Sequence, residues 1–443
     1  MIVVPFIYFT GLTIYWWQKH QGLDICVYMS ALYAFTSLCT ILIVLLDLLE
    51  EAGILFDRYD YEVNVLPTIY YCTLLTLGMW PFSLIYRKEI KPLSASSSLI
   101  LECVCWLLFF VFLLNVYLII DSTVEILSGD LSTVRQDHYN GIESPAEIKA
   151  ESLPIYIRLF FWFNNSTILA LPLFFYYSCF TDRAWWFKVM LFMTSLSMPL
   201  SGLQVADRTE FIFYGLMFIY CMIFFWKFLS RRFKRGILAL GVPLIGVILI
   251  YLVAVTQARF AKNDRDDEKA YASVLQYAGQ NFLNFCFFWE HGRFEYISPE
   301  REFPMTWHLL FHVDSNPDRR DVRAGQQGFF MSVFASYLGD VMLDLSPIGA
   351  LIWMLGFTFL NLLLIRYAHR EEYDIGDVLA VFVTATIPIF GIFYYRYYSF
   401  TYFFLYAIIV VLLLVHKVRF VYDASDKDAD IEASADIQEP ETT

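Results

Sequence analysis

Residues 201–226 read SGLQVADRTEFIFYGLMFIYCMIFFW, and the second half of this stretch is an almost unbroken apolar run. With its flanking residues the run is long enough for an α-helix to cross the hydrocarbon core of a membrane. Three charged residues, Asp207, Arg208 and Glu210, stand at the start of the run. Charge at the mouth of a membrane segment is costly unless it is paired or faces water. The stretch therefore predicts a membrane-spanning helix with a charged entrance.

The rest of the chain repeats this pattern. Of its 443 residues, 58% are hydrophobic and 17% are charged, whereas about a quarter of a soluble domain is charged. We predict an all-α fold: a polytopic membrane helical bundle of about 11 transmembrane helices with one large outer loop. The predicted spans are residues 2–17, 25–47, 64–86, 98–120, 154–179, 187–203, 209–229, 237–256, 348–367, 377–394 and 400–416.

Lysine and arginine concentrate in alternate connections, as in residues 87–91 and 227–235. Cytoplasmic loops are enriched in these residues, so we expect the N-terminus outside and the C-terminus in the cytoplasm. The chain then divides into helices 1–8 (1–256), a large extracytoplasmic loop (257–347), helices 9–11 (348–416) and a disordered acidic cytoplasmic tail (417–443).

The acidic tail holds much of the net charge of −13. No basic patch of the kind that binds nucleic acid appears in the sequence. The eight cysteines fall mostly in apolar segments without a metal-ligand spacing, so we expect buried free thiols.

Near the end of the long loop, residues 328–346 read GFFMSVFASYLGDVMLDLS. The segment is too polar to span a membrane, so we expect a helix at the surface or dipping into the outer leaflet. Asp340 and Asp344 would lie one turn apart on one face of it.

Arg208 has two interpretations. It could form an ion pair with Asp207 or Glu210 that holds the turn. Alternatively it could bind an anion, because its planar guanidinium suits phosphate and the start of a helix at Thr209 adds a positive field.

The long loop offers further candidates. Its arginines include Arg259, Arg293 and, in NPDRRDVRAGQQG, the cluster Arg319, Arg320 and Arg323. In WEHGRFE, the residues Glu290, His291 and Glu295 stand beside Arg293 and could supply a general base with an orienting partner. His308 and His312 are four apart but have no third ligand in register, so we predict no metal site.

The segment YYRYY places Arg396 beside Tyr395 at the outer end of the tenth span. This arginine is a second-rank candidate for binding sugar or phosphate, with the tyrosines as stacking platforms. The alternative is an aromatic belt at the membrane interface. Asn164 begins a glycosylation sequon, but it lies within a predicted span and we set it aside.

Four features together resemble the Wzy-type polymerases of bacterial O-antigen and capsule repeat units. They are the arginine turn SGLQVADRTEF at an outer helix mouth, one large outer loop after the next two spans, YAGQNFLNFCFFWE within that loop, and FFMSVFASYLGDVMLDLSPIGALIWMLGFTF at its end. The resemblance covers roughly residues 185–415. The sequence departs from the family pattern at Asp207, an acid beside the arginine, and at the spacing between Asp344 and Gly349.

The resemblance implies an inner-membrane enzyme that transfers glycan from undecaprenyl diphosphate to another lipid-linked oligosaccharide, without metal or other cofactor. Its partners would be that lipid-linked oligosaccharide and the bilayer, with a chain-length regulator and a flippase as further candidates, and no nucleic acid. Fixed arginines would favour the leaving diphosphate: Arg208, Arg259, Arg293, Arg319, Arg320 and Arg323. Glu290, His291 or Glu295 would act on the acceptor. The alternatives are an O-antigen ligase-like transferase, a flippase or transporter of the same lipid-linked glycan, and a structural partner of a polysaccharide complex.

Overall fold

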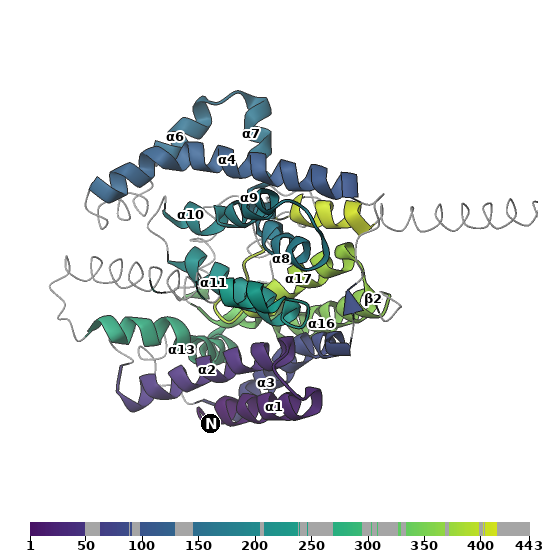
Figure 1. Cartoon of the computed structure of the whole chain (residues 1–443). Coiled ribbons are helices and arrows are strands. Elements are labelled where there is room, and N and C mark those ends of the chain that lie inside the picture. Colours follow the sequence, from purple (N-terminus) through teal and green to yellow (C-terminus); the bar gives the residue numbers. More distant parts are fainter. Residues whose placement is uncertain are drawn as a thin grey trace, which may run out of the picture.

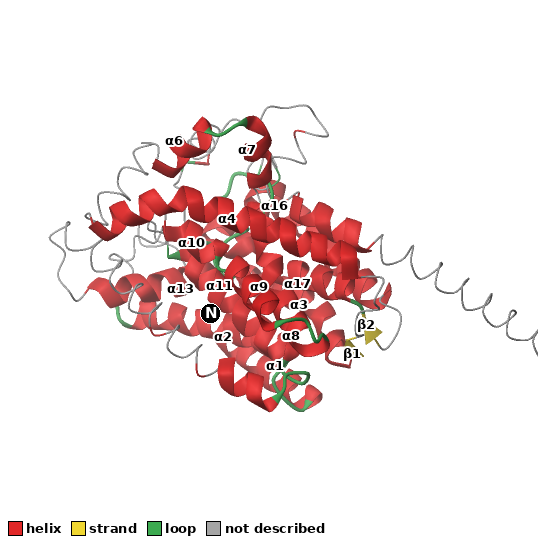
Figure 2. Ribbon diagram, turned by 45° about the horizontal axis from the view of Figure 1, so that its top comes forward, coloured by secondary structure: helices red, strands yellow, loops and turns green. Residues whose placement is uncertain are grey.

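The computed structural model describes residues 1–48, 63–87, 89–90, 98–128, 145–203, 208–237, 269–294, 334–367, 372–397 and 404–413, with the isolated residues 239, 246, 303, 308, 327, 328 and 402. Helices dominate these residues, and many of them run in a common direction (Figure 1, Figure 2). In chain order the elements are α1 (Val4–His20), α2 (Ile25–Leu45), α3 (Val65–Met79), η2 (Trp80–Arg87), β1 (Glu89–Ile90), α4 (Ser98–Ser128), α6 (Pro145–Ser152), α7 (Ile155–Phe161), η4 (Asn164–Leu169), α8 (Ala170–Phe180), α9 (Trp185–Ser195), α10 (Ser197–Leu203), α11 (Thr209–Phe225), α13 (Lys269–His291), α16 (Ser336–Tyr367), β2 (Glu372–Tyr373) and α17 (Ile375–Phe390).

Among the described residues, five helical stretches are long and apolar enough to cross a membrane: Ile25–Leu45, Val65–Ile85, Leu99–Ile120, Ile155–Phe180 and Ser336–Ile365. Shorter apolar helices are Thr209–Phe225, Ile375–Phe390 and Phe404–Leu413. The all-α class with several membrane-length helices is thus confirmed, whereas the number of 11 spans stays a prediction. The span predicted at 237–256 lies almost entirely outside the described residues.

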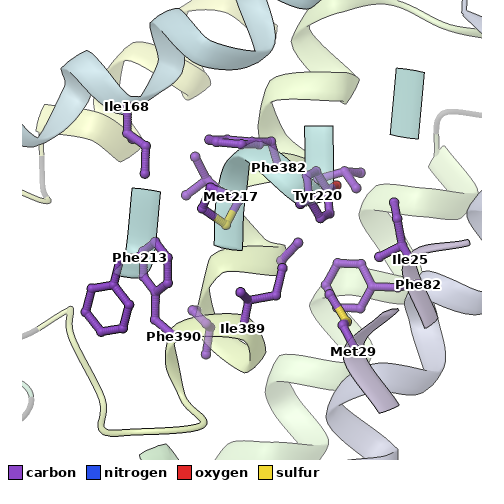
Figure 3. Packing of buried hydrophobic residues seen from close by; sticks show 14 of the residues in the cluster. Ile25, Met29, Phe82, Ile168, Phe213, Met217, Tyr220, Phe382, Ile389 and Phe390 are labelled. Carbon is purple, nitrogen blue, oxygen red and sulfur yellow. The ribbon is translucent and has the colours of Figure 1, made fainter. Parts of the chain in front are cut away.

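The core between α11 and α17 is built from apolar side chains at helical spacing. Phe213, Met217 and Tyr220 share one face of α11, as a spacing of three and four residues requires, and Figure 3 shows them against Phe382 and Phe390 of α17. The rings of Phe213 and Phe390 stack with centroids 4.3 Å apart. This packing fixes the start of α11 beside the end of α17.

Two predicted spans are broken helices. Residues 187–203 form α9 and α10, separated at Leu196. Pro199 explains the break, because its ring clashes with the carbonyl of Ser195 and it has no N–H to donate to that carbonyl. The span predicted at 154–179 likewise divides into α7, η4 and α8.

Residues 328–346 were expected as a helix at the surface or dipping into the outer leaflet. Where the structure describes them they do not lie at the protein surface, whereas their depth in a membrane stays a prediction. Residues Tyr337, Leu338, Asp340, Val341 and Asp344 are each at most 1% exposed. They form the first turns of α16, which kinks at Ser346, directly before Pro347. The segment is buried because α13 and the chain after α17 cover it.

Helix α13, which falls within the predicted outer loop, also belongs to the interior. A Cβ at Gly279 would lie 2.5 Å from the backbone carbon of Cys39 in α2, so only glycine permits this approach. Thr40 donates a hydrogen bond of 2.6 Å to the carbonyl of Gly279. The described parts of 257–347 therefore contribute core helices and do not form a layer outside the bundle.

The helix predicted to reach residue 394 ends at Phe390. Beyond it, the backbone of 391–397 runs along the start of α16: Tyr337 donates to the carbonyl of Gly391 at 2.9 Å and Ser336 to that of Phe393 at 3.0 Å. The carboxylate of Asp340 accepts the backbone N–H of Tyr395 at 2.7 Å. These bonds fix the backbone up to Tyr395 and thereby position Arg396, the next residue.

Polar contacts between elements join residues that the charge pattern places on the same side. Arg183 pairs with Glu102, and β1 pairs in parallel with β2, all at predicted cytoplasmic ends. Asn64 bonds to Glu290, and Glu210 to Arg396, at predicted outer ends. The two ends of the bundle are thus sorted consistently, while the side that faces the cytoplasm stays a prediction.

Candidate functional site

Arg208 lies at the entrance of α11, where it is the N-cap residue. Its side chain makes no capping hydrogen bond. The guanidinium carbon lies 4.9 Å from the ring centroid of Tyr277 in α13, a distance typical of a cation–π contact. The arginine that the sequence singled out is therefore held between the start of α11 and α13.

Glu210, in the first turn of α11, is bonded to Arg396. One guanidinium nitrogen, Nη2, donates to both carboxylate oxygens of Glu210, at 2.7 and 2.6 Å. The two residues are 186 positions apart in the chain. The side chains are 10% and 19% exposed, with Arg396 the more buried. This is a largely desolvated ion pair at the mouth of an apolar helix.

Aromatic groups surround the Arg396 guanidinium. Its carbon lies 4.8 Å from the ring centroid of Phe213 and 5.5 Å from that of Phe390, and Nε donates to the hydroxyl of Tyr402. Burial by itself would lower the pKa of Arg396, but Tyr402 and Glu210 raise it well above its usual value. The guanidinium therefore stays charged. Its Nη1 is buried without a hydrogen-bond partner among the described residues.

A row of rings connects the two arginines. Tyr277 contacts Phe334 at 5.3 Å between centroids, and Phe334 stacks on Tyr394 at 5.7 Å. Tyr394 lies 5.8 Å from Phe213, the ring beneath Arg396. Arg208 and Arg396 thus lie along one aromatic wall at the same end of α11.

A small cavity of about 60 Å³ opens beside the ion pair. Its polar lining comes from η4, α10, α11 and the chain beyond α17: Asn164, Asn165, Thr167, Ser201, Glu210, Arg396, Tyr397 and Tyr402. Asn164 is held in place by Asn115 of α4, whose amide also donates to Ser197 at 2.5 Å. The cavity is therefore built on fixed polar side chains.

The other described candidates lie elsewhere on α13 and beyond it. Glu290 accepts a hydrogen bond of 2.7 Å from Asn64, and the ring of His291 stacks on Phe287 at 4.4 Å. The backbone of Arg293 exchanges two bonds with the Gln327 side chain, at 2.8 and 3.2 Å. Glu290 follows Tyr277 by thirteen residues in α13, so the two lie about 20 Å apart along its axis. The structure thus separates the predicted base from Arg208.

Tyr395 packs inward. It is 7% exposed, and its ring contacts Phe303 at 5.3 Å and Trp353 at 5.8 Å. Little of the ring is open to a sugar, whereas Tyr397 and Tyr402 line the cavity. Five predicted residues lie outside the described residues: Arg259, Glu295, Arg319, Arg320 and Arg323.

A larger pocket of about 260 Å³ lies at the opposite end of α11. It is lined by Lys227 and Tyr373 and by the pair His20–Asp24, among apolar side chains. The sequence did not single out this pocket, and it shares no residue with the cavity beside Arg396.

Sequence reasoning missed several residues of the site. The pairing of Glu210 with Arg396 joins distant segments and left no local signal, and Asn164 was set aside as a sequon inside a span. One signal was present: Asn115 interrupts an otherwise apolar run, and a polar side chain at such a position usually faces a partner or a cavity.

The fold and the site together define an all-α protein with membrane-length helices and a charged, aromatic-lined site at one end of the bundle. No protein-family model matches the chain, and no curated protein or solved structure is significantly similar to it.

Proposed function

We propose that the chain is a bacterial inner-membrane polymerase of lipid-linked oligosaccharide repeat units, of the O-antigen or capsule type. The observation that carries the proposal is the placement of Arg208 and Arg396 along one aromatic wall, at the helix entrance predicted to face outward. A lipid-linked diphosphate presents its charge at the membrane surface. Its sugars need hydrogen-bonding and aromatic groups beside that charge.

In the proposed reaction an acceptor sugar hydroxyl attacks the anomeric carbon of the donor. The bond from that carbon to the diphosphate oxygen breaks, and undecaprenyl diphosphate leaves with the electron pair. Arg208, at a helix N-terminus, would stabilise the charge that develops on this leaving group. The hydroxyl proton must pass to a base within hydrogen-bond reach of the attacking hydroxyl. Glu290 and His291 lie about 20 Å along α13 from Tyr277, the ring that Arg208 contacts, and are too distant for this step. Of the predicted bases, Glu295 lies beyond the described residues.

The test is a gel of surface polysaccharide from a deletion strain of the source bacterium. The strain is complemented with wild type, with Arg208→Ala, or with Arg158→Ala, an exposed arginine of α7 that serves as the matched control. We expect the deletion strain to retain a single repeat unit and to lack the long ladder. Wild type and Arg158→Ala should restore the ladder, and Arg208→Ala at equal expression should not.

Other patterns would favour other functions. An unchanged ladder in the deletion strain contradicts a polymerase. Loss of every repeat unit, including the first, indicates a ligase or a flippase instead.

A further inference from the structure

We infer that the cavity beside Glu210 and Arg396 binds a neutral sugar substituent that both donates and accepts hydrogen bonds, of the acetamido type. The inference rests on the proposed function in taking the ligand to be a glycan. It assigns the two arginines different tasks: Arg208 faces the diphosphate, and Arg396 recognises the sugar.

The charge of the cavity argues against an anion. Nη2 of Arg396 already donates to both oxygens of Glu210, so the pair is neutral as a unit. A phosphate entering the cavity would meet the Glu210 carboxylate at close range, and like charges in a desolvated site repel strongly. A neutral polar group meets no such barrier.

The lining side chains define what that group must offer. Asn164 lines the cavity and accepts from Asn115 through its amide oxygen, so its own amide N–H groups are donors for a ligand carbonyl or hydroxyl oxygen. Glu210 lines the same cavity. A carboxylate oxygen can accept more than one hydrogen bond, so Glu210 can accept from a ligand N–H or O–H.

The size and remaining lining narrow the choice further. A volume of about 60 Å³ is several times what one water molecule needs, which is enough for one substituent of a sugar. Ile168, Met198 and Phe390 give the cavity an apolar wall. An acetamido group offers an N–H to Glu210, a carbonyl oxygen to the donors of the lining and a methyl group to the apolar wall. A hydroxyl group lacks the methyl.

The experiment uses the purified full chain in detergent and saturation-transfer NMR. The probes are the methyl glycosides of N-acetylglucosamine and N-acetylgalactosamine, with methyl glucoside as the sugar without an acetamido group. We expect transfer to the acetyl methyl protons of at least one N-acetyl probe. Binding of methyl glucoside should be at least about tenfold weaker, the equivalent of about 1.4 kcal/mol, and pyrophosphate should not displace the signal.

Two variants test the location. Ser201→Leu, which fills the cavity, should abolish the transfer, whereas Ser152→Leu on the exposed face of α6 should not. Glu210→Gln keeps the shape but leaves Arg396 with a net charge. It should weaken binding of the N-acetyl probe and allow pyrophosphate to compete.

Several results would overturn the inference: no transfer to either N-acetyl probe, equal binding of methyl glucoside, displacement by pyrophosphate in wild type, or an undiminished signal in both Ser201→Leu and Glu210→Gln. The polysaccharide gel tests the proposed polymerase function independently of this binding experiment. An N-acetyl signal that depends on the cavity, together with an unchanged ladder, would keep the subsite and reject the polymerase.

Discussion

Glu210 and Arg396 neutralise each other at the mouth of an apolar helix, where either charge alone would be costly. A single charge there loses hydration without compensation. In the pair, Arg396 donates two short hydrogen bonds to Glu210 and lies against Phe213 and Phe390. Removing one partner leaves the other charged and desolvated, which typically costs more than the pair is worth.

We therefore expect Glu210→Gln and Arg396→Gln each to lower the free energy of unfolding by about 3 kcal/mol. The double variant should recover much of that loss, because neither charge is then left alone. Unfolding of the purified variants in detergent, followed by the fluorescence of the tryptophans, measures the four corners of the cycle. Strictly additive losses would mean that the pair is not coupled.

Arg208 is a residue that could be predicted from the sequence, whereas its surroundings could not. Arg208 was identifiable because a charge beside a long apolar run is visible in one stretch of sequence. The interpretation of Arg208 as an ion-pair partner of Glu210 could not anticipate that Glu210 pairs with Arg396. The contact between Glu210 and Arg396 depends on the packing of α11 against α17. The sugar-binding role predicted for Arg396 stays a proposal, now with Tyr397 and Tyr402 beside it in place of Tyr395.

At the scale of the element, composition predicts the helices and proline predicts some of their breaks. Helix α2 was expected over 25–47 and is found at Ile25–Leu45, because its run is continuously apolar. Pro199 lies in the sequence where α9 must end, although the span was predicted as one helix. The burial of α13 was missed, because an amphipathic aromatic helix in a long loop also fits a membrane surface.

Gly279 permits the contact between α13 and α2, and its replacement should be costly. A Cβ there would meet backbone atoms of Cys39 and Thr40 at 2.5 and 2.6 Å, and backbone cannot rotate away as a side chain can. We expect Gly279→Ala to destabilise the protein by about 1–3 kcal/mol.

The matched control is Gly356→Ala on α16, where an added Cβ has nothing within 4 Å. This change should be neutral or slightly stabilising, since alanine favours helix over glycine. Thermal unfolding of both variants in the same detergent provides the comparison. Equal unfolding temperatures would show that α13 does not approach α2 this closely.

In the molecule as a whole, α11 connects two chemically different ends of the bundle. Its seventeen residues span about 26 Å, close to the hydrocarbon thickness of a bilayer. Arg208 and Glu210 lie at one end, and Lys227 lies just beyond the other. Loop charge alone predicts which residues share one end of the bundle, but not the way in which α13 and α16 fill the space between the two ends.

Labelling from outside the cell tests this sidedness. In a background without native cysteines, Glu290→Cys should react with a membrane-impermeant maleimide in intact cells, whereas Lys227→Cys should react only after permeabilisation. Both positions are exposed in the fold, so accessibility within the protein does not separate them. The opposite pattern would place the Arg208 site in the cytoplasm, where the proposed reaction does not occur.

The decisive measurement is polymerisation by the purified protein itself. Lipid-linked single repeat units extracted from the deletion strain are incubated with the reconstituted full chain, and the products are separated by gel. We predict a ladder of longer products for wild type and for Arg158→Ala, and none for Arg208→Ala. Folded wild-type protein that leaves the single units unchanged, or an Arg208→Ala variant as active as wild type, would contradict the proposed site and its function.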